Sequence, residues 1–354
     1  MAEPPKVVAV RATIYRGEED VRIEDVDDAR IEEGTDAVVR ITHGAICGSD
    51  LWFYRGYEDW EPGWRLGHEF IGVVEDVGDR VNTVKKGDRV IAPFAFSDGT
   101  CEFCRSGLPT SCHHGDFWGR TNDGGQAEAA RVPLADGTLI RLPEEIASSP
   151  ELLVASLPLT DVMSTGHHAA VSADVKPGST VAVIGDGAVG LCAVYAACRF
   201  GAERVIAVGH HESRLDVARG FGATDVVDSH STDALEQLVE MTGGGVPYVL
   251  EAVGSQASME LAIEAVRPGG SIGYVGAPMA VDGIHPGGLF AKNASLAGGV
   301  APARVYIPEL LTDVAAGTLD PSPVLDLRTD LDGVPAAYAA MHERRAIKAY
   351  FVSE

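Results

Sequence analysis

Residues 180–190 read TVAVIGDGAVG, and no other segment says as much about the architecture of this chain. Its first five residues form an apolar run, as expected for a strand that is buried on both faces of a parallel sheet. Gly185, Gly187 and Gly190 then form the pattern Gly-x-Gly-x-x-Gly, followed by small residues suited to a helix. A strand, a glycine-rich turn and a helix in this order bind the pyrophosphate of a dinucleotide at the helix N-terminus. We therefore expect these glycines, with Ala188 and Val189, to contact a dinucleotide.

The segments downstream alternate between helix-like and strand-like patterns. We expect helices at 188–200, 213–221 and 232–241, and strands at 204–208, 225–227, 248–252 and 271–275. This alternation is typical of a doubly wound parallel sheet. It predicts a Rossmann coenzyme domain over residues 164–304.

The end of the second strand of this domain bears on which dinucleotide is used. Enzymes that use NAD place an acidic residue here to bind the ribose 2′-hydroxyl. This chain has Gly209, which leaves room for a 2′-phosphate, with His210, His211 and Arg214 as donors to it. The pattern favours NADP. An NAD enzyme with relaxed recognition, or with Glu212 reaching back, is the alternative.

The chain upstream of residue 160 has a different pattern of apolar and turn-forming residues. Short β-type runs at 37–41, 70–78 and 88–93 are separated by Gly and Asp, which predicts a β-rich, partly closed barrel. The end of the chain has mixed character and a closing strand at 349–352, which could pack on this first part. We therefore expect a β-rich domain built from residues 1–163 and 305–354.

A second group of motifs lies in the first 70 residues. Cys47 opens the segment CGSD, and His68 and Glu69 lie within the segment GHEFIG. A catalytic zinc uses about three ligands of these types and leaves one position open. Asp50 is a candidate acceptor for the second ring N–H of His68, which would fix its tautomer. Ser49 offers a hydroxyl that could take the proton of an alcohol at the metal.

Together these motifs resemble a known family, the zinc-dependent medium-chain dehydrogenase/reductases, also called zinc-type alcohol dehydrogenases. The resemblance covers essentially the whole chain. Its marks are CGSD at 47–50, GHEFIG at 67–72, a cysteine-rich segment at 98–112 and the glycine fingerprint at 185–190. It implies an α/β protein in which a GroES-like catalytic domain accompanies the Rossmann domain. It also implies a homodimer or homotetramer.

In that family the third protein ligand of the catalytic zinc precedes a segment that here reads TGHHA, at residues 165–169. The resemblance therefore implies Cys47, His68 and Asp161 as ligands, with Glu69 as an exchanging ligand or as a partner of the ligands. Without the resemblance, Asp161 would be interpreted as a helix N-cap.

The resemblance also implies that Thr165 and Lys348 contact the coenzyme, Lys348 through the pyrophosphate. One departure concerns Trp52, because many relatives carry at this position a histidine that completes a proton relay. Three interpretations stay open: a shorter relay through Ser49 and the nicotinamide ribose, a different proton exit, or a role of Trp52 as a wall of the substrate pocket.

Relatives hold a structural zinc with four cysteines in the segment that corresponds to 98–112. Here the first of the four aligns with Asp98, and a carboxylate is a legitimate zinc ligand. We expect a structural zinc whose ligands are Asp98, Cys101, Cys104 and Cys112. A metal-free lobe held by packing is the alternative, and His113 and His114 are backup ligands.

Composition narrows the functional class. A net charge of −24 over 354 residues argues against binding to nucleic acid or to an anionic membrane. It indicates either a high-salt cytoplasm, where counterions relieve self-repulsion, or an acidic protein from a high-GC genome. We expect no leader segment and a cytoplasmic location, where six reduced cysteines favour metal binding.

These observations predict a zinc-dependent alcohol dehydrogenase that transfers hydride between an alcohol or carbonyl and NADP, with NAD as the other coenzyme considered. Trp52, Phe94 and Trp118 are candidate walls of a fairly apolar substrate pocket. A sugar or polyol dehydrogenase of the same superfamily is the nearest alternative. A zinc-free enone reductase would lack the metal ligands, and a catalytically silent NADP-binding regulatory protein would bind the coenzyme without turnover.

Overall fold

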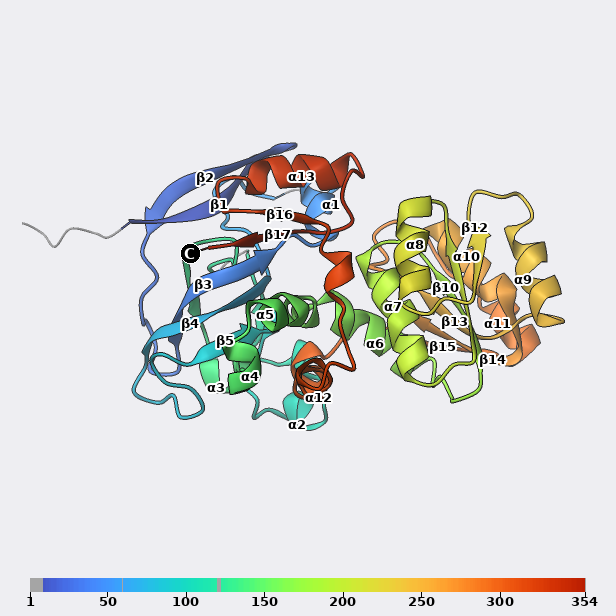
Figure 1. Ribbon diagram of the computed structural model, residues 1–354, viewed down its shortest axis with the longest axis horizontal. Coiled ribbons are helices and arrows are strands. Elements are labelled where there is room, and N and C mark those ends of the chain that lie inside the picture. Colours follow the sequence, from blue (N-terminus) through green and yellow to red (C-terminus); the bar gives the residue numbers. More distant parts are fainter. Residues whose placement is uncertain (1–8, 59, 120–121, 354) are drawn as a thin grey trace, which may run out of the picture. The chain divides into compact units, whose positions relative to one another are not determined.

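The computed structural model describes residues 9–58, 60–119 and 122–353. The chain divides into two compact units (Figure 1). The first unit combines Met1–Asp161 with Pro302–Glu354, and the second is Val162–Ala301. The predicted domain limits at 163/164 and 304/305 lie a few residues from these divisions.

The first unit is built around a seven-stranded sheet with the order β16-β17-β3-β4-β5-β9, in which β8 also pairs with β3. The strands of this unit are β1 (Ala9–Gly17), β2 (Asp20–Asp27), β3 (Ala37–Ala45), β4 (Glu69–Val77), β5 (Arg89–Ala92), β6 (Ala95–Phe96), β7 (Asp116–Phe117), β8 (Ala129–Val132), β9 (Ile140–Arg141), β16 (Leu327–Thr329) and β17 (Ala349–Val352). Outside the seven-stranded sheet, β1 pairs with β2 and β6 pairs with β7. Its helices are α1 (Asp50–Tyr54), α2 (Glu102–Arg105), α3 (Ala135–Thr138), α4 (Glu144–Ala147), α5 (Pro150–Ser156), α12 (Ala303–Ala315) and α13 (Val334–His342), with short 3-10 turns η1 (Pro109–Ser111), η2 (Leu157–Thr160) and η3 (Ser322–Val324).

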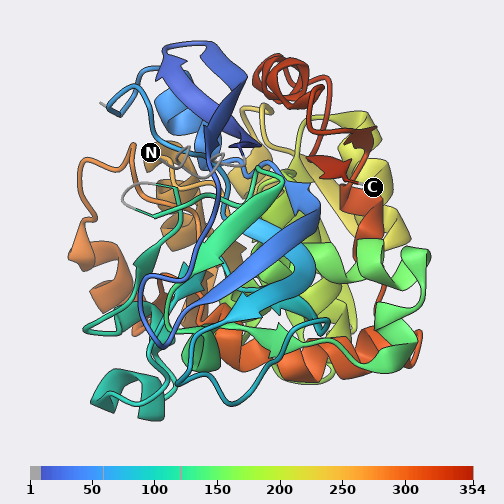
Figure 2. The same cartoon turned by 90° about the vertical axis from the view of Figure 1, so that its left-hand side faces the viewer.

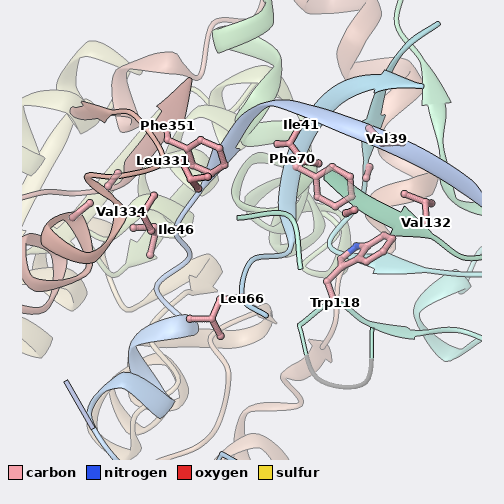
Figure 3. Close-up of a cluster of buried hydrophobic side chains, with 14 of the residues drawn as sticks. Val39, Ile41, Ile46, Leu66, Phe70, Trp118, Val132, Leu331, Val334 and Phe351 are labelled. Atoms are coloured by element: carbon pink, nitrogen blue, oxygen red, sulfur yellow. The ribbon is translucent and has the colours of Figure 1, made fainter. Parts of the chain in front are cut away.

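The antiparallel pair β3 and β4 forms the centre of this sheet (Figures 1 and 2). Most residues of β3 are buried on both faces, which explains its long apolar run. Phe70 on β4 packs its ring against Trp118 with 5.2 Å between ring centroids (Figure 3). From the far end of the chain, β17 pairs antiparallel with β3 and adds Phe351 to the same core. The predicted closing strand at 349–352 is therefore confirmed.

The second unit is a six-stranded parallel sheet with the order β12-β11-β10-β13-β14-β15. Its strands are β10 (Thr180–Ile184), β11 (Arg204–Gly209), β12 (Asp225–Asp228), β13 (Val246–Glu251), β14 (Val266–Tyr274) and β15 (Ser295–Gly298). Its helices are α6 (Val162–Ser172), α7 (Ala188–Arg199), α8 (Glu212–Gly220), α9 (Ala234–Thr242), α10 (Gln256–Ala265) and α11 (Pro286–Lys292). This strand order is that of a doubly wound dinucleotide fold, so the predicted α/β architecture of this part is confirmed.

The glycine fingerprint forms the turn between β10 and α7. Gly185 has φ +119°, a conformation that favours glycine. A Cβ at Gly190 would lie 2.0 Å from the carbonyl oxygen of Gly185, so this glycine is needed for close helix–strand packing. A Cβ at Gly187 would meet no atom within 4 Å, which leaves open space beside the helix N-terminus. The turn thus has the shape that close approach of a pyrophosphate requires.

Among the described residues, none of the helices has the length and apolar character needed to cross a membrane.

Candidate functional site

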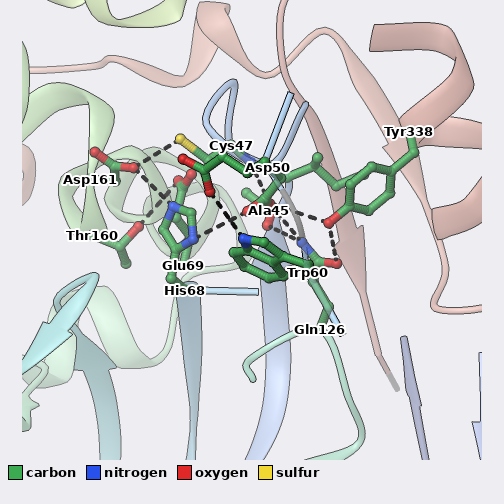
Figure 4. Close-up of polar contacts among 12 residues, drawn as sticks. Ala45, Cys47, Asp50, Trp60, His68, Glu69, Gln126, Thr160, Asp161 and Tyr338 are labelled. Carbon is green, nitrogen blue, oxygen red and sulfur yellow. Dashed lines mark hydrogen bonds and ion pairs between the residues drawn. The ribbon is translucent and has the colours of Figure 1, made fainter. Parts of the chain in front are cut away.

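Three predicted metal ligands converge within the first unit (Figure 4). Cys47 follows β3 and His68 precedes β4, and the pairing of Ala45 with Glu69 brings these strand ends together. Asp161 follows η2. Its Oδ2 lies 3.1 Å from the Sγ of Cys47 and 3.2 Å from the Nε2 of His68. Residues more than 90 positions apart in sequence are therefore brought to one point.

The donor set fits zinc. One ligand atom from each of Cys47, His68, Glu69 and Asp161 can be chosen so that all four lie within 4.8 Å of one another. Bond lengths of 2.0–2.3 Å in a tetrahedron place neighbouring ligand atoms roughly 3.4 Å apart. The sulfur–oxygen and nitrogen–oxygen distances of 3.1 and 3.2 Å are close to that spacing. Cys47, His68 and Asp161 are therefore able to hold zinc with little rearrangement.

Burial and mutual contact shift the pKa values of all three groups. Burial raises the pKa of the Cys47 thiol to about 11, and the Asp161 carboxylate raises it further. Burial opposes ionisation of Asp161 too, but the hydrogen bond from His68 outweighs it and lowers the pKa of Asp161 to about 2. Burial would lower the pKa of His68, whereas Asp50 and Asp161 raise it well above its ordinary value. A bound metal would replace the thiol and imidazole protons.

Asp50 lies next to the ring nitrogen of His68 that faces away from Asp161, which is the place expected for an acceptor. Its Oδ1 lies 3.4 Å from the Nδ1 of His68, and its Oδ2 accepts a hydrogen bond from the backbone N–H of Cys47 at 3.1 Å. Two residues that the sequence did not single out hold the same oxygen: Gln126 donates from Nε2 at 3.2 Å, and Tyr338 donates its hydroxyl at 3.3 Å. The Asp50 carboxylate therefore links both ligand-bearing segments to the C-terminal helix α13.

Glu69 forms a buried ion pair with Lys348. Lys348 Nζ donates to Glu69 Oε1 at 2.5 Å and to the carbonyl of Ile46 at 3.1 Å, while Thr160 lies 3.4 Å from Glu69 Oε2. Neither charged residue is exposed to solvent. This environment corrects the expectation for Lys348: its ammonium supports the metal site through Glu69 and does not face outward toward a pyrophosphate.

A second metal-type cluster is formed by the cysteine lobe. Ligand atoms of Asp98, Cys101, Cys104 and Cys112 lie within 4.8 Å of one another. The backbone N–H of Cys104 donates to the sulfur of Cys101, which lowers the pKa of Cys101 to about 7, whereas burial raises the pKa of Cys104 to about 12. The donor set of three sulfurs and one carboxylate suits a structural zinc.

The two histidines of the lobe lie outside this donor set. His114 Nδ1 is 2.7 Å from Oδ2 of Asp98, and His113 Nε2 is 3.3 Å from Glu102. His114 thus orients the unusual carboxylate, and His113 is turned away from the cluster toward α2.

The expected pocket residues have different environments. Trp118 is 3% exposed, donates its Nε1–H to the carbonyl of Pro93, and packs on Phe70 in the core, so its assignment to the substrate pocket was wrong. Phe94 is buried, and its backbone N–H donates to Thr160 beside Asp161. Trp52 is half-buried on α1. Ser49, exposed at the start of the same helix, makes no side-chain capping bond.

The predicted coenzyme residues lie in the second unit, apart from Lys348. Gly209 ends β11, and His210, His211 and Arg214 follow it at the start of α8. The side chains of His211 and Arg214 are 24% and 13% exposed. Thr165 is largely buried within α6. The fingerprint and the end of β11 are neighbours, because β10 and β11 pair in parallel register.

Comparison with known proteins supports the division of the chain into two parts. Residues 33–144 match the family model of the alcohol dehydrogenase GroES-like domain, and residues 188–316 match that of zinc-binding dehydrogenases. The chain is 34% identical over 352 residues to the uncharacterized zinc-type alcohol dehydrogenase-like protein AdhB of Bacillus subtilis, covering 89% of this chain and 92% of that protein. It is also 34% identical over 324 residues to the NADP-dependent isopropanol dehydrogenase of Entamoeba histolytica, covering 88% and 87% of the two chains.

Among solved structures, alcohol dehydrogenase TADH from Thermus sp. ATN1 superposes with a TM-score of 0.90 at 32% identity, covering 97% of this chain and all of that chain. The predicted GroES-like fold of the first unit is thereby confirmed.

Proposed function

Because this chain belongs to the zinc-binding alcohol dehydrogenase family and is an oxidoreductase acting on CH–OH groups, we propose that it interconverts a fairly apolar alcohol and its carbonyl with NADP, using Cys47, His68 and Asp161 as catalytic zinc ligands. The observation that carries the ligand assignment is the meeting of thiol, imidazole and carboxylate at 3.1 and 3.2 Å. The assignment of a structural zinc to Asp98, Cys101, Cys104 and Cys112 is part of the same proposal.

Each side chain has a distinct part in this chemistry. Zinc, when bound, would supply a Lewis acid that lowers the pKa of an alcohol hydroxyl. The Asp50 carboxylate, 3.4 Å from Nδ1 of His68, favours a proton on that nitrogen and so keeps Nε2 directed at the metal position. Glu69 adds buried negative charge behind the ligands, balanced by Lys348. Ser49 is exposed two residues beyond Cys47, where its hydroxyl can pass the alcohol proton to solvent.

The preference for NADP is supported by the end of β11. Gly209 brings no acidic side chain of its own to repel a 2′-phosphate, and His210, His211 and Arg214 supply donors beside it. The relative from Entamoeba histolytica carries NADP in its name, which is consistent with this preference.

Initial rates with a panel of primary and secondary alcohols test the proposal, comparing NADP with NAD before and after chelation. We expect chelator-sensitive turnover that is faster with NADP. Turnover that survives complete zinc removal would refute the ligand assignment, and equal rates with both coenzymes would refute the preference.

We also propose a cytoplasmic homodimer or homotetramer joined through edge strands of the second unit. The edge strand β15 is mostly exposed, and Phe290 and Val300 nearby in sequence are 87% and 53% exposed. Six free cysteines suit a reducing compartment. Light scattering tests the assembly: a monomer at micromolar concentration would refute it.

A further inference from the structure

Asp186, which lies between the first two glycines of the fingerprint, reaches across to the end of the neighbouring strand. Its Oδ2 accepts hydrogen bonds from the backbone N–H groups of His210 and His211, each at 2.9 Å. The Nδ1 of His211 lies 2.9 Å from the same oxygen, and a guanidinium nitrogen of Arg214 lies 3.9 Å from Oδ1. The side chain of Asp186 is 10% exposed. It therefore joins β10 to the residues that follow β11.

Asp186 also occupies the space beside Gly209. A Cβ at Gly209 would lie 2.6 Å from the Cβ of Asp186 and 2.8 Å from its Oδ2. Such distances are too short for a side chain at residue 209 unless Asp186 moves. The carboxylate of Asp186 thus explains why residue 209 is a glycine. An acidic residue introduced at 209 would change the local packing as well as the coenzyme preference, so its effect could not be assigned to preference alone.

Oδ2 of Asp186 is committed to the protein, whereas Oδ1 lies 3.9 Å from the Arg214 guanidinium. Burial would raise the pKa of Asp186, but the hydrogen bonds from His211 and His210 outweigh burial and lower it. An oxygen that already faces three donors has little capacity left to accept from a ribose hydroxyl. Its charge is balanced locally by Arg214 and by the polarised N–H groups. Asp186 therefore acts as an internal counter-ion.

The ring of His211, which Asp186 holds, lies at one end of a row of imidazoles. The ring centroids of His210 and His211 are 3.9 Å apart, and His210 stacks on His230 at 3.7 Å. Asp186, His210 and His211 carry donor types that also bind metals. A cation there would have to displace the donors on Oδ2 and would be repelled by Arg214, so the cluster suits an anion better.

We propose that Asp186 is the positioning residue for recognition of the 2′-phosphate: it fixes the backbone of His210 and His211 and the ring of His211, so that imidazole and guanidinium donors face the phosphate. This inference rests on the proposed preference for NADP. It assigns the specificity for the 2′-phosphate to a residue of the fingerprint and to the histidines that it holds. Residue 209 is then a glycine because Asp186 occupies the space that a side chain would need.

The test measures dissociation constants of NADPH and NADH by fluorescence titration, with the thermal midpoint of each variant. Asp186→Ala removes the anchor, while Asp186→Asn keeps an acceptor oxygen. Glu212→Ala is the matched control, because it removes a neighbouring carboxylate that is 73% exposed and bonds to Arg219. We expect Asp186→Ala to weaken NADPH binding by about tenfold, with little effect on NADH, since hydrogen bonds to charged groups have about that strength. Asp186→Asn, which keeps an acceptor oxygen but loses the charge, should weaken NADPH binding less than Asp186→Ala does, and Glu212→Ala should stay near wild type.

Other results would overturn the inference. Equal weakening of both coenzymes with a lower thermal midpoint would mean that Asp186 is merely structural. Selective weakening of NADH would mean that its carboxylate binds the ribose directly. If Glu212→Ala weakened NADPH binding as much as Asp186→Ala, the effect would come from the overall charge of this region and not from the contacts of Asp186. A wild type without preference for NADPH would refute the proposed coenzyme and this inference together, whereas absent turnover with normal NADPH selectivity would refute only the catalytic proposal.

Discussion

Replacement of Lys348 by methionine should destabilise the first unit severely. Lys348 is fully buried, and its ammonium donates to Glu69 at 2.5 Å and to the Ile46 carbonyl at 3.1 Å. Methionine fills a similar volume without a donor. The Glu69 carboxylate would remain at 0% side-chain exposure with the Thr160 hydroxyl at 3.4 Å as its remaining hydrogen-bond donor among the described contacts.

The magnitude follows from the environment of the pair. Removing one partner of a buried ion pair costs about 3–5 kcal/mol, because the other charge stays desolvated. For a unit of this size, that loss corresponds to a fall in thermal midpoint of roughly 10 °C. Replacing both partners removes the uncompensated charge, so Lys348→Met combined with Glu69→Gln should be more stable than Lys348→Met alone.

Urea unfolding of the zinc-loaded protein, followed by far-UV circular dichroism, measures these differences. Lys86→Met provides the control, since Lys86 is exposed and its loss should change stability by less than about 0.5 kcal/mol. A Lys348→Met variant within about 1 kcal/mol of wild type would refute the reasoning. So would a double variant less stable than Lys348→Met alone.

Four further outcomes are expected. Cys47→Ser or His68→Ala should abolish turnover and leave NADPH binding nearly intact by fluorescence, while Cys198→Ser keeps both; joint loss of activity and binding would mean that the metal is structural. Asp98→Cys should raise zinc retention after dialysis against chelator and raise the thermal midpoint, and an unchanged zinc content would indicate a lobe held by packing. Burial lowers the pKa of His43 to about 4, so the unfolded chain binds the proton more readily than the folded chain does. The free energy of unfolding should therefore be highest above pH 6.5 and should fall by up to about 3 kcal/mol toward pH 4. The variant His43→Gln should flatten the pH dependence of the urea midpoint over that range. With a net charge of −24, the thermal midpoint should rise between low and molar KCl, where the screening length shortens to about 3 Å, and a flat response would favour the high-GC interpretation.

The second unit was predictable because its sequence constraints are local. The helices expected at 188–200, 213–221 and 232–241 are confirmed as α7, α8 and α9 with shifts of one or two residues at their ends. Buried parallel strands need continuous apolar runs, and the turn needs glycine at positions where a Cβ would collide. Each of these requirements can be read within about ten residues of chain.

The surroundings of the metal site were not predictable in the same way. Gln126, Tyr338 and Lys348 lie 76, 288 and 279 positions from the side chains they hold, and no spacing rule connects them. Their residue types have many other uses in proteins. Trp118 illustrates the opposite error: it is one of three aromatic residues predicted to line the substrate pocket, but its ring packs in the core against Phe70.

The contact between Ile46 and Lys348 has a consequence for biosynthesis. The two residues are separated by 302 positions, with the whole second unit between them. At translation rates of about 5–20 residues per second, the ribosome needs roughly 15–60 s to deliver Lys348 after Ile46 has emerged. Throughout that interval the carbonyl of Ile46, which precedes Cys47, and the carboxylate of Glu69 lack their contacts with Lys348. The second unit is contiguous in sequence and can already fold. Until β17 is added, β3 therefore lacks this neighbouring strand, and a product that stops short of Lys348 would leave the Glu69 carboxylate without its neutralising ammonium.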